Sequence, residues 1–336
     1  MKFLDFSLKK VTLPFKRPLQ IGRNKLYTKT SLYLTLHFSG GFSGTGEISL
    51  LPGLIDLTPE EAKKETLNYL TPLLGLSLNI KKDLKITRPF FNLLPTQMLS
   101  SPGVFGIEMA LMSKPFQEIC VPVNDLIYPG GKLPKTSNPT VKVKIGRKEE
   151  EVQFLNQLGK MKGVSLRLDG NRNFSVNKLL TFLKKLEPQT QKKIEYLEEP
   201  LEKISDWPEI HEKTGLSLGI DESLLEYNKN VPPGTSTFII KPSFHGGISK
   251  TLSLFKDAKK RNIKCVVSST FETSLGLYTL ALLAKNNNKT PAGINTFNYL
   301  EEKNPFHQIS QTEEGLSFKA LPPTLKEARM NTLHPF

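Results

Sequence analysis

Residues 194–201 read IEYLEEPL: a short apolar run ends in two adjacent carboxylates, Glu198 and Glu199, and Pro200 then stops it. A carboxylate after a strand is usually a turn former or a helix cap. In this chain, however, one short apolar run after another ends in a charged residue. That repetition decides the predicted fold.

From about residue 120 onward these runs alternate with helical segments. Residues 175–186 and 249–262, for example, carry apolar residues three and four apart, which is helical spacing. Strands and helices that alternate every 20 to 30 residues or so predict a parallel (β/α) barrel of the TIM type. An open doubly wound sheet is the alternative, but it does not so naturally place a polar residue at the end of nearly every strand. The eight candidate strands are residues 121–127, 140–146, 163–169, 193–198, 216–221, 237–241, 264–269 and 294–299.

The first part of the chain reads as meander strands followed by helices. Residues 31–40, SLYLTLHFSG, alternate apolar and polar side chains, which predicts a strand. The glycine-rich residues 40–47, GGFSGTGE, lead into EISLLPG rather than a helix, so we predict a hairpin-like turn or loop instead of a phosphate loop. A helix should begin after Thr58, with Glu61 closing a capping box, and a second one near Ser101.

The bulk composition is that of a globular protein. The chain has 336 residues, of which 38% are hydrophobic, enough for a large barrel or two domains. Cys120 and Cys265 are too few for a disulfide framework and fit a reducing compartment. Charged residues interrupt the first 17 residues, so they do not form a signal peptide, and no run is long enough to span a membrane. We therefore expect a cytoplasmic protein with no membrane association.

The formal net charge of +14 is the one unusual bulk figure. It is compatible with nucleic acid, an acidic membrane surface or anionic small substrates. The lysine pairs are scattered among glutamates, and no zinc-finger or aromatic-basic motif is present. We therefore expect no nucleic-acid partner. A zinc hydrolase is disfavoured because none of the five histidines has His-Glu-x-x-His spacing.

The strand period predicts which charged side chains point into the barrel. Residues two apart in a strand share a face, and covering helices require the outer face to be apolar. In residues 140–146, for example, Lys142 and Lys144 lie on the face opposite the apolar residues. Five consecutive strands place a charged residue at matched inward parity at their ends, which isolated caps or solvated lysines hardly explain. These residues are Lys144, Asp169, Glu198, Asp221 and Lys241.

The predicted convergence of these side chains indicates a metal site. Three carboxylates in a partly desolvated cavity repel one another, which protonation or a divalent cation relieves. One oxygen from each of three strands, plus waters, suits octahedral Mg²⁺. The neighbouring charge of Lys142 should lower the pKa of Lys144, which would make Lys144 a general base.

These segments together resemble the enolase superfamily, specifically its muconate cycloisomerase-like branch. KVK resembles that branch's Lys-x-Lys strand, LRLDGN, LEEP and IDES resemble its three metal-ligand segments, and IIKPS resembles its opposite lysine. GEISLLPG and SSTFETSLG resemble the o-succinylbenzoate synthases more than other members. The resemblance runs over nearly the whole chain.

The resemblance implies an α+β capping domain, residues 1–100 with the C-terminal tail 305–336, over a modified (β/α)₇β barrel of residues 101–304. It implies Mg²⁺, with Mn²⁺ as a substitute, on Asp169, Glu198 and Asp221. It assigns the remaining roles as follows: Lys144 as the base, Lys241 as the catalytic group on the opposite face, Lys142, Ser268 and Ser269 as substrate-binding residues, and Arg167, Asn171 and Glu199 as groups that orient the ligands.

The implied reaction is the syn dehydration of a cyclohexadiene carboxylate through an enediolate, giving o-succinylbenzoate for menaquinone biosynthesis. The substrate would be a small anionic carboxylate, which a basic protein attracts. An N-succinylamino acid racemase or a dipeptide epimerase would use the same two lysines, and a cycloisomerase is a third alternative. Residues 17–30, expected to form a specificity loop, match no family pattern and leave the substrate open, and the sequence does not indicate an oligomeric state. A non-catalytic protein on this barrel would be expected to have lost one of the five charged residues.

Overall fold

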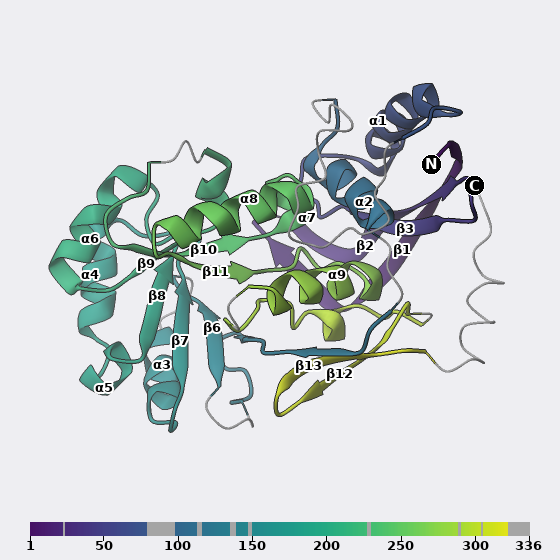
Figure 1. The fold of residues 1–336 in the computed structure, drawn as a ribbon. Helices are drawn as coiled ribbons and strands as arrows, with labels where there is room; N and C mark the ends of the chain where they lie inside the picture. Colours follow the sequence, from purple (N-terminus) through teal and green to yellow (C-terminus); the bar gives the residue numbers. More distant parts are fainter. Residues whose placement is uncertain are drawn as a thin grey trace.

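The computed structural model describes residues 1–22, 24–78, 98–112, 116–134, 139–146, 150–226, 230–287, 290–303 and 305–321. In these ranges the chain forms an antiparallel sheet near the N-terminus, a curled sheet of parallel strands and a small sheet near the C-terminus (Figure 1). None of the helices described in these ranges has the length and apolar character to cross a membrane.

The N-terminal sheet is an antiparallel meander of β1 (Phe3–Ile21), β2 (Asn24–Phe38) and β3 (Ser43–Ser49). The alternation predicted in β2 is confirmed, because Leu32, Leu34 and Leu36 are all buried in one hydrophobic cluster. The expectation of a loop at residues 17–30 is wrong. That segment is the tip of the long β1–β2 hairpin, in which the two strands pair right up to the turn.

Two helices pack with this sheet. α1 (Pro59–Leu70) begins with the predicted capping box: the Thr58 hydroxyl accepts a hydrogen bond from the Glu61 N–H at 3.2 Å, and the Glu61 carboxylate accepts one from the Thr58 N–H at 2.8 Å. α2 (Ser101–Leu111) lies directly on β3. A Cβ at Gly46 would come within 1.8 Å of the Gly106 carbonyl oxygen, so this glycine permits helix and strand backbones to touch. The first residues of the segment 40–47 form the turn between β2 and β3, as predicted, whereas residues 43–47 belong to β3 and are not a loop.

The parallel sheet contains seven strands in strict chain order. An open doubly wound sheet reverses its strand order at a switch point, and this sheet does not, so the barrel prediction is confirmed. The strands are β5 (Asp125–Ile127), β6 (Thr140–Lys144), β7 (Ser165–Asp169), β8 (Ile194–Glu198), β9 (Leu218–Ile220), β10 (Thr235–Ile240) and β11 (Lys264–Val267).

Helices alternate with these strands and lie outside the sheet (Figure 1). The α-helices are α3 (Glu151–Gly159), α4 (Val176–Lys184), α5 (Pro188–Gln191), α6 (Trp207–Thr214), α7 (Pro242–His245), α8 (Gly247–Lys260) and α9 (Ser274–Lys285). The short 3₁₀ turns are η1 (Thr71–Leu73), η2 (Ile204–Asp206), η3 (Glu222–Glu226) and η4 (Phe297–Tyr299).

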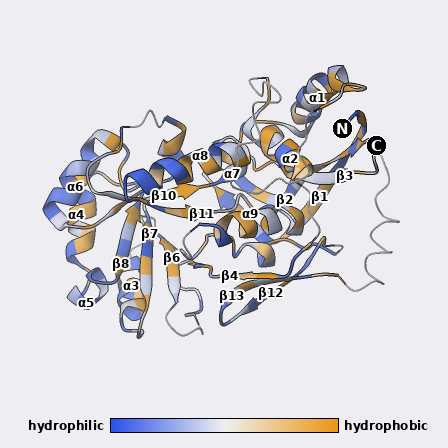
Figure 2. Ribbon diagram, in the orientation of Figure 1, coloured by the Kyte–Doolittle hydropathy of each residue, from blue (hydrophilic) through white to orange (hydrophobic). Residues whose placement is uncertain are grey.

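The two faces of the strands bury different residues, as strand parity predicts. Leu168 and Phe238 face the helices in the large hydrophobic cluster. Tyr196, Ile239 and Val266 form a separate small cluster on the other face. In Figure 2, β10 is largely in the hydrophobic colour, whereas much of the outer helix surface is hydrophilic. The charged residues at the strand ends therefore continue an inward face.

Two predicted strands differ from the structure. Residues 121–127 are not one strand, because β4 (Ile119–Val121) pairs with β13 (Gly315–Lys319) of the small sheet, and only β5 joins the barrel. Residues 294–299 are not a strand either. Ala292 and Gly293 bridge Val123 and Ser268 instead, so the eighth position of the barrel lies just before the predicted one. A tight turn at residues 294–296 then leads into η4.

The predicted domain boundaries at residues 100 and 305 stay a prediction. α2 packs with both parts, because Ile107 lies in the cluster of the N-terminal sheet and Phe105 in the cluster around α9. In the tail, β12 (Gln308–Thr312) and β13 form a hairpin beside β4. Residues 322–336 of the predicted tail lie outside the described residues.

Candidate active site

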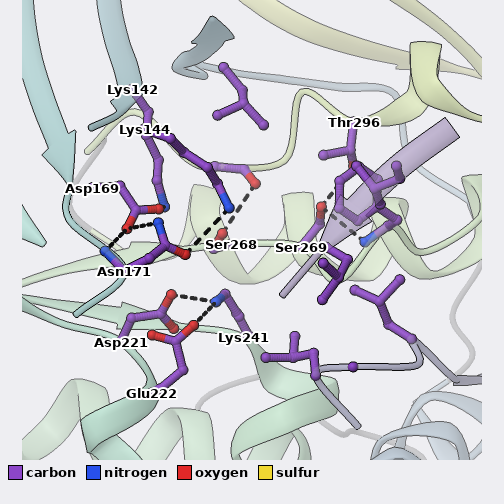
Figure 3. Close-up of a pocket in the computed structure, with 18 of the residues that line it drawn as sticks. Lys142, Lys144, Asp169, Asn171, Asp221, Glu222, Lys241, Ser268, Ser269 and Thr296 are labelled. Carbon is purple, nitrogen blue, oxygen red and sulfur yellow. Dashed lines mark hydrogen bonds and ion pairs between the residues drawn. The ribbon is translucent and has the colours of Figure 1, made fainter. Parts of the chain in front are cut away.

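A cavity of about 290 Å³ lies at the C-terminal ends of the barrel strands (Figure 3). The β1–β2 hairpin and the segment after β3 supply its apolar side. Its charged and polar lining includes Lys142, Lys144, Asp169, Asn171, Asp221, Glu222, Lys241, Ser268, Ser269 and Thr296. Its apolar lining includes Leu19, Ile21, Leu51, Leu54, Leu126 and Phe271. Most of the residues predicted from strand parity therefore meet in one cavity.

Lys142 bridges two of the predicted metal ligands. Its Nζ lies 2.9 Å from Oδ2 of Asp169 and 2.6 Å from Oε1 of Glu198. Burial alone would lower the pKa of Lys142, but the carboxylates, Asp169 first, outweigh burial and raise this pKa well above its usual value. Lys142 is thus a fixed positive charge among the carboxylates.

Lys144, at the end of β6, reaches the cavity beside Asn171. Its Nζ lies 3.5 Å from Oδ1 of Asn171, whose side-chain amide donates to Oδ1 of Asp169 at 2.7 Å. Burial would raise the pKa of Asp169, but the ammonium groups of Lys142 and Lys144 outweigh it and hold that pKa below its usual value. The Asp169 carboxylate is therefore anionic.

Lys241 enters from another side of the cavity (Figure 3). Its Nζ donates to Oδ2 of Asp221 and lies 3.4 Å from Oε1 of Glu222. Burial, and then the neighbouring Glu222 carboxylate, raise the pKa of Asp221 well above its usual value. A single ammonium group is therefore shared by two carboxylates of unequal burial.

Glu199 supports Asp221 from behind. It is fully buried, with φ at +39°. Its Oε1 accepts hydrogen bonds from the N–H groups of Asp221 at 2.8 Å and Ser223 at 2.9 Å. Its Oε2 accepts from Nε of Arg172 at 2.7 Å. Glu199 therefore holds the chain at Asp221 and leaves Glu198 as the inward carboxylate.

The carboxylates have the chemistry of a divalent-cation site. Oε2 of Glu198 and Oδ1 of Asp221 are buried and have no hydrogen-bond partner in the described part of the chain. Carboxylate oxygens are the ligands that Mg²⁺ prefers, and two unpartnered buried oxygens can accept such an ion. Within the described ranges no three acidic, histidine or cysteine side chains are already arranged around one point as a metal site; Lys142 and Lys241 are bonded to the carboxylates instead.

Three other predicted residues have mixed outcomes. Ser268 and Ser269 line the cavity, and Ser269 Oγ lies 2.7 Å from Oγ1 of Thr296. The expectation that Arg167 orients the ligands is not met by its contacts. Arg167 lies two residues before Asp169 in the sequence. Its Nε donates a hydrogen bond to Glu195 at 2.8 Å, and its Nη1 donates to Asn124 and to the Pro291 carbonyl oxygen. Two residues of strand span about 6.6 Å, which places Arg167 deeper in the barrel.

Strand parity did not predict that Glu222 and His245 are part of the site. Both follow a strand end, where parity no longer applies. Glu222 stands next to Asp221 in the IDES segment, and that adjacency was the available signal. His245 lies one helical turn after Lys241, in α7. Burial, and then the nearby Lys241 charge, lower the pKa of His245 to about 3, so its ring is neutral.

A buried charge network behind the cavity was also missed. Lys29 on β2 is 1% exposed and donates to Oγ of Ser49 at 2.8 Å. Glu47 on β3 accepts from the Thr273 N–H at 3.0 Å, at the start of α9. Glu272, in the loop after Ser268 and Ser269, accepts from the Thr270 N–H at 2.7 Å. The network thus ties the N-terminal sheet to the loop that lines the cavity.

The chain is similar in sequence to known proteins. Residues 136–320 match the family model described as enolase C-terminal domain-like. The o-succinylbenzoate synthase of Pasteurella multocida is 28% identical over 317 residues, covering 88% of this chain and 90% of that protein. The o-succinylbenzoate synthase of Haemophilus influenzae is 29% identical over 307 residues, covering 88% and 91%.

A solved structure has the same fold. The dipeptide epimerase of Methylococcus capsulatus, complexed with Mg and the dipeptide L-Arg-D-Lys, superposes with a TM-score of 0.71 at 18% identity, covering 97% of this chain and 99% of that one. This similarity confirms the predicted fold, a (β/α) barrel with an α+β capping domain. Because the family model matches more than half of the residues, the chain belongs to the enolase C-terminal domain-like family of the enolase superfamily.

Proposed function

We propose that this protein is a Mg²⁺-dependent lyase that forms o-succinylbenzoate by syn dehydration of a cyclohexadiene carboxylate. The observation that carries the proposal is the placement of Lys144 and Lys241 on different sides of one cavity that also holds Asp169 and Asp221 (Figure 3). The names of the curated relatives, which match over nearly their whole length, favour the synthase among the reactions that such a site can perform.

The proposed metal ligands are Asp169, Glu198 and Asp221; the first two end β7 and β8, and Asp221 directly follows β9. A bound Mg²⁺ ion, or Mn²⁺ in its place, would supply positive charge opposite the substrate carboxylate, which acidifies the neighbouring C–H. Lys142 adds a permanent positive charge between Asp169 and Glu198. The site would therefore attract an anionic substrate and orient its carboxylate.

Lys144 is the proposed general base. In its neutral form it takes the proton from the carbon next to the substrate carboxylate, and the C–H electron pair moves toward the carboxylate. The resulting ammonium then returns that proton to the departing hydroxyl on the same face, so one water leaves and the ring becomes aromatic. Lys241, on the other face, stabilises the negative charge electrostatically and the ring by a cation–π contact.

The rest of the cavity suits a ring with a polar side arm. Leu19, Leu54 and Phe271 offer apolar contacts to a six-membered ring. Ser268 and Ser269 lie in the same lining and are the proposed partners of the distal, polar part of the substrate. Residues 17–22, at the hairpin tip, would thus take part in substrate selection.

A racemase or epimerase is the second candidate, because a solved protein of the same fold is a dipeptide epimerase. Lysines on two faces of one carbon can remove a proton from one side and return it on the other. N-succinylamino acids and dipeptides are the corresponding substrates, and no additional catalytic group is required.

The test is turnover of the cyclohexadiene substrate, followed by ultraviolet absorbance, with Mg²⁺ and with EDTA. Lys144→Ala should lower kcat by about 10²- to 10⁴-fold, the contribution of a general base. The matched control is Lys184→Ala, which removes an exposed lysine of α4.

Conversion that is lost both with EDTA and in Lys144→Ala would support the synthase. A folded, Mg²⁺-loaded protein that converts none of the substrate would overturn it. Deuterium exchange at the α-carbon of N-succinylamino acids and dipeptides would then test the second candidate, for which Lys144→Ala and Lys241→Ala should each abolish exchange on one face.

A further inference from the structure

His245 connects the two strand ends that carry Asp221 and Lys241. It is 5% exposed and ends the short helix α7, which begins with Pro242 directly after Lys241. Its Nδ1 lies 2.9 Å from the backbone nitrogen of Lys241, and its Nε2 lies 3.0 Å from the backbone oxygen of Asp221. The ring therefore lies between the main chains of two residues of the proposed site.

These partners determine the tautomer of the ring. The nitrogen of Lys241 carries a proton, so Nδ1 of His245 must accept a hydrogen bond. The oxygen of Asp221 can only accept, so Nε2 must carry the proton and donate it. A neutral imidazole with the proton on Nε2 satisfies both contacts. Because both ring nitrogens are used by the backbone, His245 is not available to exchange protons with a substrate.

The ring links the two chains beyond the last residue pair of the sheet. The last paired residues of β9 and β10 are Ile220 and Phe238. The carbonyl group of Asp221 and the N–H of Lys241 come after that pair, where the strands separate. A buried backbone group without a partner is destabilising. The imidazole accepts the Lys241 N–H and is a second donor to the Asp221 carbonyl, which also accepts the Leu224 N–H at 2.9 Å, so the ring links the two chains beyond the sheet.

Side chains hold the Asp221 main chain at both of its polar groups. Oε1 of Glu199 accepts the Asp221 N–H at 2.8 Å, and Nε2 of His245 donates to its carbonyl oxygen. Lys241 is held at both of its groups as well, because its carbonyl oxygen accepts the backbone N–H of His245 at 2.8 Å. Among the described residues, His245 is thus the one that forms hydrogen bonds to the backbones of both Asp221 and Lys241.

We propose that His245 is a positioning residue, which sets the placement of the Asp221 carboxylate and the Lys241 ammonium through their backbones. The proposal rests on the function proposed above for its kinetic readout and on the proposed metal site for its Mn²⁺ readout. It predicts that removal of the two ring hydrogen bonds weakens both divalent-cation binding and turnover in a protein that remains folded. Such supporting groups typically contribute about 10- to 100-fold to metal affinity or activity.

The test compares two substitutions of similar size. His245→Leu keeps an apolar side chain but neither hydrogen bond, whereas the amide of His245→Gln can accept at one atom and donate at the other. Electron paramagnetic resonance measures the Mn²⁺ affinity of each variant. Steady-state kinetics with the cyclohexadiene substrate give kcat and KM, and the thermal midpoint reports whether the variant is folded. His211→Leu is the matched control, because His211 also bonds a backbone oxygen, that of Leu216 at 2.9 Å, outside the cavity.

We expect His245→Leu to lose about 10- to 100-fold in Mn²⁺ affinity and in kcat, with His245→Gln retaining most of both and His211→Leu unchanged. A folded His245→Leu protein with wild-type Mn²⁺ affinity and kcat overturns the proposal. Equal losses in the Leu and Gln variants overturn it too, because they show that the ring's hydrogen bonds are not the cause.

Nitrogen-15 NMR of labelled histidines gives a readout that needs neither a stable variant nor a substrate. The His245 signal, assigned by its disappearance in His245→Gln, should show the proton on Nε2; a proton on Nδ1 overturns the proposal. If the wild-type protein does not turn over the cyclohexadiene substrate, the synthase assignment fails, while the Mn²⁺ affinity and the tautomer still decide the role of His245.

Discussion

Lys142 Nζ lies 2.6 Å from Oε1 of Glu198, and both side chains are largely buried. Glu198 is a proposed metal ligand, so a divalent cation must share this carboxylate with the ammonium group. In the protein without metal, Lys142 is the cation that offsets the charge of Glu198. The lysine and the metal therefore stabilise the same carboxylates.

Lys142→Met should make the fold dependent on Mg²⁺. Without metal, the variant leaves buried carboxylates without their partner, which costs about 3–5 kcal/mol of unfolding free energy. Added Mg²⁺ should then raise the melting temperature more in the variant than in the wild type. Melting curves with EDTA and with Mg²⁺ check this, with Lys185→Met, an exposed lysine, as control. An equal Mg²⁺ effect in wild type and variant would contradict the shared role.

Glu199→Gln should weaken metal binding although Glu199 is not a proposed ligand. The carboxylate accepts hydrogen bonds at both oxygens, including those from Asp221 N–H and Arg172 Nε. An amide can accept at only one atom, and each donor left unsatisfied costs about 1–3 kcal/mol. We expect a 10- to 100-fold or so loss of Mn²⁺ affinity. The control is Glu202→Gln, which changes an exposed glutamate of the same segment. Equal Mn²⁺ affinities of the two variants would refute the prediction.

The inward residues were predictable because strand geometry is local. A period of two places Lys144, Asp169 and Glu198 on one face of their strands, whatever the rest of the chain does. The apolar residues between them identify the opposite face, which the helices cover. The cavity follows once those strands stand in chain order.

The remaining features depend on contacts that local periodicity does not encode. Residues 17–30 become the end of a hairpin because β1 and β2 pair again from Leu19 and Leu26 to the turn, after an irregularity that follows Pro14. Residues 294–299 are rich in β-branched and aromatic residues, which favour a strand, but Asn295 and Thr296 use their side chains to bond Asp125 and Ser269. His245 acts through a helical turn placed after a strand. The family resemblance supplied the roles of the charged residues, which periodicity alone does not assign.

Lys29→Met should loosen the attachment of the N-terminal sheet to the loop beyond Ser269. Lys29 is the buried cation near Glu47 and Glu272. Without it the two carboxylates keep their hydrogen bonds but lose a nearby positive charge, which should cost about 3–5 kcal/mol. Urea unfolding measures this loss, and a raised KM would report the displaced loop. The control is Lys25→Met, an exposed lysine of the same strand; comparable stability of the two variants would refute the role of the network.

Glu108 should make stability fall as the pH rises. This carboxyl group on α2 accepts hydrogen bonds from the backbone N–H groups of Ile248 and Ser249 at the start of α8. Burial raises its pKa from 4.5 to about 8, and the two backbone donors only partly oppose that.

The folded protein therefore binds a proton on Glu108 that the unfolded chain releases above about pH 4.5. The stabilisation is complete below that pH and is lost as the pH rises to about 8, with a slope of at most about 1.4 kcal/mol per pH unit. Glu108→Gln stays neutral, so the free energy of unfolding of the wild type minus that of the variant should decline across this window. Urea titrations at several pH values measure the difference, and a difference that does not change with pH would show that Glu108 is ionised in the folded protein throughout.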